Sequence, residues 1–80
     1  MKVQLLKGSF NPKELEKILT DLINVKIKYH ESKIQSSDEE ETIKMRENRI
    51  IKLQNELSEL RKYIQNANKD IVVESEISLN

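Results

Sequence analysis

Residues 43–67 read IKMRENRIIKLQNELSELRKYIQNA and place an apolar side chain at every seventh position. A second set of apolar side chains follows three residues after members of the first set. Together the two sets extend over about three and a half heptads. The first set is Ile43, Ile50, Leu57 and Ile64, and the second is Leu53, Leu60 and Ala67. A heptad repeat keeps one stripe of a helix turned towards a neighbouring helix. The segment therefore predicts an amphipathic helix that needs a helical partner.

An earlier helix is indicated by the sequence Asn11-Pro12-Lys13-Glu14, which combines a capping asparagine, a proline at the first helical position and an early glutamate. Apolar residues continue with helical spacing to Ile34, so we expect this helix to span about residues 12–36. They cover about 200° of its circumference, which is wider than one neighbouring helix requires. The width predicts contact with a further element or a second subunit.

The join between the two helices is the sequence Ser37-Asp38-Glu39-Glu40. Ser37 and Glu40 have the spacing of a capping box, and the run of acids suits the positive end of a helix dipole. We therefore expect a second helix over about residues 38–68 that folds back on the first as an antiparallel hairpin. Since neither glycine nor proline interrupts the join, one long helical rod is the alternative.

Both ends of the chain have the spacing of short strands. Val3 and Leu5 alternate with polar residues over about residues 2–7, ahead of Gly8, the only glycine, which we expect to form a turn. Residues 71–79 alternate in the same way. An antiparallel pair at the open end of the hairpin is the simplest topology, and the pattern leaves open whether the strands pair within one chain or between two.

The expected fold is mainly α: one domain of residues 1–80 in the order β-α-α-β, a coiled-coil-like antiparallel hairpin with short N- and C-terminal strands. A chain of 80 residues without cysteine has a marginal core. We therefore expect a homodimer that forms a four-helix bundle. The expected seam consists of Leu15, Ile18, Leu22, Ile43, Ile50, Leu53, Leu57, Leu60 and Ile64. The candidate subunit contact consists of Ile23, Ile27, Ile34 and Tyr63.

The charges cancel over the whole chain but not along it. Residues 1–35 carry seven lysines against four acids, whereas residues 36–80 carry seven basic residues against ten acids. This asymmetry favours attraction between the two halves over attraction of an external polyanion. No run approaches the ~20 apolar residues of a membrane span, and the N-terminus lacks the pattern of a secretory signal. We expect a cytoplasmic protein with no membrane partner.

The sequence indicates no catalytic, cofactor or metal site, so we expect a protein that is not an enzyme. The absence of cysteine excludes thiol chemistry, and one glycine cannot build a phosphate-binding loop. His30 is the only histidine, and Ile27 stands where a dinuclear bundle site would need a glutamate. Nearby cations should keep the imidazole neutral and packed. Arg46 interrupts the heptad seam. A polar residue there can set the register or the oligomeric state, but we favour a side chain that reaches solvent or an acid such as Glu41.

Two alternatives to a self-associating structural module remain open. One is an RNA- or DNA-binding hairpin that uses the lysines of the first helix beside Tyr29. These candidates are Lys13, Lys17, Lys26, Lys28 and Lys33. Because acids interrupt them and the chain is neutral, we do not expect nucleic acid to be the main partner. The other alternative is an adaptor or inhibitor that docks onto an unidentified protein, with residues 71–79 adding to a foreign sheet.

The sequence Lys7-Gly8-Ser9-Phe10-Asn11-Pro12, followed by Lys26-Ile27-Lys28-Tyr29-His30, resembles a group of small uncharacterised bacterial proteins. These proteins have a strand, a glycine and proline turn, and a helical hairpin. The resemblance covers about the first half of the chain. It implies the hairpin fold and a bacterial origin, and it assigns a function to no residue.

Overall fold

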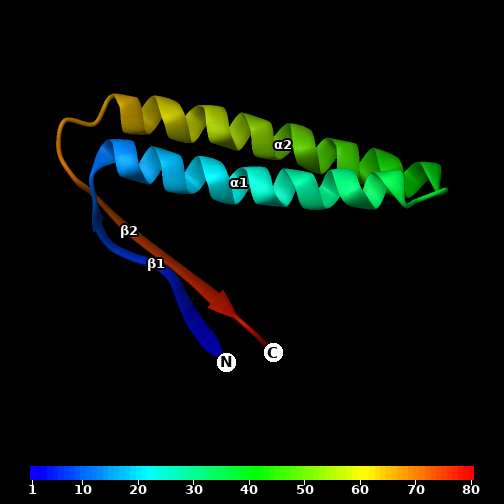
Figure 1. Ribbon diagram of the computed structural model, residues 1–80, viewed down its shortest axis with the longest axis horizontal. Helices are drawn as coiled ribbons and strands as arrows, with labels where there is room; N and C mark the ends of the chain where they lie inside the picture. The colour runs from blue at the N-terminus through cyan, green and yellow to red at the C-terminus, as the bar shows by residue number, and fades with distance from the viewer.

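The computed structural model covers residues 1–80 and consists of a helical hairpin and a two-stranded ribbon (Figure 1). The elements in chain order are β1 (Lys2–Phe10), α1 (Pro12–Gln35), α2 (Glu40–Gln65) and β2 (Ile71–Ser78). The two helices lie side by side, and the two strands pair antiparallel within the chain. The predicted β-α-α-β hairpin is therefore confirmed, and the single helical rod is excluded.

β1 extends to Phe10, three residues beyond the predicted end at residue 7. Gly8 does not form the expected turn, because it stays in the ladder opposite Val73 with a φ of 133°. That backbone conformation is open to glycine and strained for residues with a Cβ atom. The strand therefore continues through Gly8, and the pair of Phe10 with Ile71 is the last one before the hairpin.

A β-bulge at Leu5 determines the two faces of the ribbon. Gln4 pairs with Glu76 and Leu6 pairs with Ser75, so Leu5 has no partner across the ladder. Side chains alternate between faces with a period of two, and one extra residue reverses that alternation. Val3 therefore lies on the same face as Leu6 instead of the opposite one.

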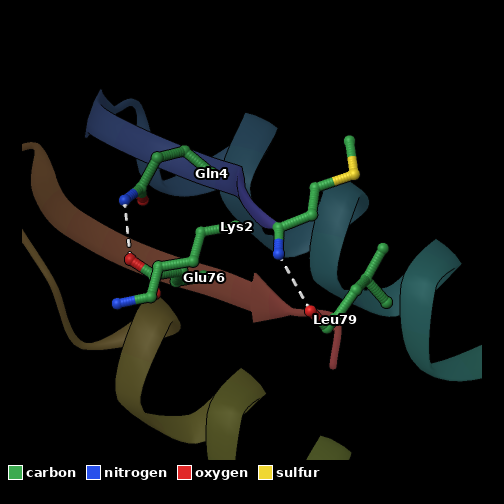
Figure 2. A network of polar contacts seen from close by, with 5 residues as sticks. Lys2, Gln4, Glu76 and Leu79 are labelled. Carbon is green, nitrogen blue, oxygen red and sulfur yellow. Dashed lines mark hydrogen bonds and ion pairs between the residues drawn. The ribbon is translucent and has the colours of Figure 1, made fainter.

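The bulge leaves the ribbon with one apolar and one polar face. The apolar face carries Val3, Leu6, Gly8, Phe10, Ile71, Val73, Ser75 and Ile77, and the opposite face carries Lys2, Gln4, Lys7, Ser9, Val72, Glu74, Glu76 and Ser78. On the polar face the Gln4 amide donates to a Glu76 carboxylate oxygen at 3.1 Å, and the Lys2 Nζ lies 3.9 Å from the other oxygen. The Met1 ammonium donates to the Leu79 carbonyl at 2.9 Å and closes the free end (Figure 2).

The start of α1 is as predicted, whereas the start of α2 is not. Asn11 caps α1, since its Oδ1 accepts a hydrogen bond of 2.9 Å from the Lys13 backbone N–H. No capping box forms between Ser37 and Glu40. The Ser37 hydroxyl instead accepts a 3.2 Å hydrogen bond from the Glu39 N–H, and Glu39 occupies the N-cap position. α2 therefore begins two residues later than predicted, at Glu40.

α2 ends at Gln65 instead of the predicted residue 68. The contacts between the helices show where the two ends meet: Arg46 lies 3.0 Å from His30, and Arg61 lies 3.6 Å from Glu16. The first turn of α1 and the last turn of α2 therefore lie beside each other at the open end of the hairpin.

The fold is one layer thick. The Cα atoms extend over 47 × 32 × 13 Å. The helices pack on each other and the strands pair with each other, whereas the ribbon and the helices share few contacts. The radius of gyration is 15.2 Å, against about 12 Å for a compact chain of this length. Domains normally pack two layers around a core. Only four residues of this chain are buried, all in the hairpin: Leu15, Ile23, Leu53 and Ile64.

Candidate association surface and basic cluster

α1 carries two apolar stripes on different sides. The first lies on the side that touches α2, where His30 and Glu16 contact Arg46 and Arg61. With 3.6 residues per turn, Ile23 shares this side, and it is buried. This stripe supplies the α1 half of the hairpin core.

The second stripe, which we call the outer stripe, consists of Ile18, Leu22, Val25 and Tyr29. Spacings of four, three and four residues place these side chains along one line, as in a coiled-coil seam. Val25 is 65 % exposed and Tyr29 is 50 % exposed, whereas Ile18 and Leu22 are half-buried. The stripe has the spacing that packs against a further helix. Val25 at its centre is open, whereas Tyr29 at its end meets α2 through the Arg46 guanidinium.

The free end of the ribbon is the second apolar surface. The ribbon leaves the open end of the hairpin and diverges from α1 towards the termini (Figure 1). Near the hairpin Phe10 and Ile71 are half-buried, but farther out Val3 and Ile77 are each 39 % exposed. We call this exposed region the ribbon tip; it consists of Met1, Val3, Leu5, Ile77 and Leu79.

The predicted seam and subunit-contact residues occupy different environments. Of the nine seam residues, Leu15, Leu53 and Ile64 are buried, and the half-buried ones are Ile18, Leu22, Ile43, Ile50, Leu57 and Leu60. Among the candidate subunit contacts, Ile23 is buried inside the hairpin, Ile27 and Ile34 are half-buried, and Tyr63 is 70 % exposed. Val25 and the ribbon tip were not selected from the sequence. The period of α1 could have indicated Val25, but the bulge that places Val3 on the apolar face of the ribbon has no sequence signal.

The five predicted lysine contacts do not form one row. Lys13, Lys17 and Lys28 lie on one side of α1, and Lys26 and Lys33 lie on another side, next to Tyr29. All five are exposed, and Lys17 forms an ion pair of 3.3 Å with Asp21. Only Lys26 and Lys33 have cations of α2 as neighbours.

Arg46 reaches across to α1, so the prediction that it reaches solvent or Glu41 is wrong. Its Nη1 lies 3.0 Å from the Nδ1 of His30, and its guanidinium lies 5.5 Å from the centre of the Tyr29 ring. The Lys33 Nζ lies 5.6 Å from the same ring. A polar group at a seam position restricts how two helices align. Arg46 therefore helps to set the register of the hairpin.

The pKa of His30 is lowered from its ordinary value of 6.5, first by partial burial and then by the charges of Arg46, Arg49 and Lys26. The geometry points in the same direction, because Arg46 donates its hydrogen bond to an Nδ1 that carries no proton. The imidazole is thus held neutral, as expected from the sequence.

This lowered pKa predicts a loss of stability in mild acid. Between the lowered pKa and about 6.5 the unfolded chain binds more protons than the folded one, so the free energy of unfolding falls as the pH drops below about 6.5. Urea titrations between about pH 7.5 and 5.5 measure the free energy of unfolding, and His30→Gln is the control that removes the titrating group. Equal pH dependence in the two proteins would contradict the prediction.

The structure thus defines a β-α-α-β hairpin protein with two unfilled apolar surfaces and a group of cations from both helices around Tyr29 and His30. Neither helix combines the length and the apolar composition that crossing a membrane requires. No group of three or more histidine, cysteine or acidic side chains is placed to hold a metal ion. Comparisons of the chain with protein-family models, curated proteins and solved structures found no match.

Proposed function

We propose that this chain is a self-associating structural module whose functional unit is a homodimer. One observation carries the proposal: the chain exposes 6510 Å² of surface, whereas a compact monomer of 9.4 kDa exposes about 5,000 Å². The difference of about 1,500 Å² is surface that a chain of this size normally buries.

A second copy of the chain accounts for an area of this size. Two chains that each bury about 1,500 Å² form an interface of about 3,000 Å², within the range of about 2,000–5,000 Å² found for obligate homodimers. The net charge of zero means that two copies do not repel each other as a whole. A two-fold axis would bring the same surface of each copy together.

The outer stripe and the ribbon tip form the proposed interface. Pairing the outer stripes of two copies makes a four-helix bundle and gives each α1 the second helical neighbour that its spacing favours. The ribbon tip covers the partner with its apolar face, and its polar face remains in water. This arrangement supplies the second layer that the single chain lacks.

The molar mass in solution tests this proposal. We expect light scattering behind a sizing column to give 18.8 kDa, twice the 9.4 kDa of one chain, independent of concentration. A mass of 9.4 kDa over the whole concentration range would contradict a homodimer. The two apolar surfaces would then be open to a different protein, in agreement with the adaptor alternative.

A further inference from the structure

We propose that the hairpin binds an oligophosphate, a ligand with two or three linked phosphate groups, through a cluster of cations contributed by both helices. This basic cluster consists of Lys26, Lys33, Arg46, Arg49 and Lys52. All five cations belong to one chain, so a single copy contains the whole cluster. Because Tyr29 also belongs to the outer stripe, the cluster lies at the edge of the proposed dimer interface.

The cations converge on Tyr29 and His30. A shallow cavity of about 110 Å³ lies between the helices, with Lys26, His30, Arg49 and Lys52 in its wall. Beside it, Lys33 and Arg46 both lie over the Tyr29 ring. Donors from two helices therefore surround a single site.

None of the five cations has a carboxylate within 4.0 Å, although the chain contains fourteen acids. Other cations of the chain do form such pairs, namely Lys2, Lys17, Lys44 and Arg61. Glu56 is the only acid in the cavity wall. Like charges held together repel one another, and a bound anion removes that repulsion. The cluster is therefore suited to a ligand with several negative charges.

Arg46 lies next to the cavity, in contact with His30, which lines it. Its Nε is buried and has no hydrogen-bond partner, while Nη1 is fixed on His30. A guanidinium presents its donors in a rigid fork that matches phosphate oxygens. Because Nδ1 of His30 accepts from Arg46, the neutral imidazole keeps its proton on Nε2, where it can also donate.

The size of the cluster limits the ligand. Lys26 and Lys33 are separated by about 10 Å along α1, Arg46 and Lys52 by about 9 Å along α2, and packed helices lie about 8–10 Å apart. Two or three linked phosphates can cover this area, whereas the backbone of a long duplex extends well beyond it. A free oligophosphate and a short single strand of nucleic acid share this chemistry.

Binding of tripolyphosphate is the first test, measured by calorimetry at about 50 mM salt on the full chain. We expect binding that weakens as salt is added. The single histidine gives a second readout by NMR, because a bound anion offsets the charges of Lys26, Arg46 and Arg49 and should raise the pKa of His30. Absence of both binding and this pKa change at low salt would overturn the proposal.

Two double variants separate the cluster from general charge. We expect Arg49→Gln with Lys52→Gln to weaken binding by about tenfold or more, since one lost charge-assisted hydrogen bond corresponds to about that factor. The control is Lys13→Gln with Lys28→Gln, which removes the same charge from the other side of α1 and should leave binding unchanged. All four residues are exposed, so both variants should keep the fold. Equal weakening in the two variants would contradict a defined site.

A short single-stranded RNA identifies the source of the phosphates. If tripolyphosphate binds as tightly as the RNA, the ligand is a free oligophosphate. If the RNA binds more tightly and the Arg49 and Lys52 variant loses that binding too, the ligand is a nucleic acid strand. RNA binding that survives this variant would overturn the assignment. The molar mass of the same samples shows separately whether the protein is a dimer.

Discussion

Leu53→Asp is expected to unfold the hairpin, whereas Ile51→Asp should leave it folded. Leu53 is 7 % exposed at the centre of α2, and Ile51 is 54 % exposed two residues away. An unpaired charge at a buried position costs about 3–5 kcal/mol. A chain of 80 residues has a total stability of about 4–12 kcal/mol, so the first change removes much of it. The second change costs only about 0.3 kcal/mol or less in helix propensity.

Circular dichroism and urea titration measure this difference. The two variants carry the same charge and the same number of apolar residues, so they differ only in where the aspartate stands. We expect Leu53→Asp to lose most of its helical signal at 25 °C and Ile51→Asp to keep it. If Leu53→Asp retains the helicity and the urea midpoint of Ile51→Asp, the seam between α1 and α2 is not the core of this fold.

Val3→Lys combined with Ile77→Glu is expected to convert the proposed dimer into a monomer. Val3 and Ile77 are direct partners in the ladder, so the new charges attract each other and keep the two strands paired. The same charges lie on the apolar face of the ribbon tip, where a second copy would have to desolvate them. Each charge transferred from water into an interface costs several kcal/mol.

The matched control places the same pair of charges on the other face of the ribbon. Ser9 and Val72 are also direct partners, and Val72 is 81 % exposed, so Ser9→Lys with Val72→Glu should stay dimeric. Light scattering measures the mass of both variants, and circular dichroism verifies that both remain folded. A folded Val3 and Ile77 variant that keeps the dimer mass would exclude the ribbon tip from the interface.

The helical elements could be predicted because their signals are local. At the start of α1, Asn11 accepts a hydrogen bond from a free backbone N–H, and Pro12 has no N–H that needs a partner. The structure confirms the cap and the position of the proline. The sequence predicts a start of α2 that is two residues too early, because the Ser37 hydroxyl can form either of two local hydrogen bonds. It can cap a helix or bind the N–H two residues on, and in this chain it binds Glu39.

The candidate site was only partly accessible from sequence. Lys26 and Lys33 could be selected as exposed cations on a predicted helix. Arg49 and Lys52 stand on the other helix, and only the observed register brings them to His30. The position of the turn sets which residue of α2 faces each residue of α1. A shift of one or two residues in the turn therefore changes every contact between the helices.

The order of the elements and the apolar seam follow from local signals, because heptad spacing and helix caps act over a few residues, and the same signals favour the hairpin over a single rod. Which apolar surfaces stay open depends instead on contacts between distant parts of the chain. The bulge at Leu5 turns Val3 to the face of Leu6, and it arises from pairing with a strand some seventy residues away. The same holds for Arg46, whose place beside Tyr29 and His30 depends on how α1 and α2 align.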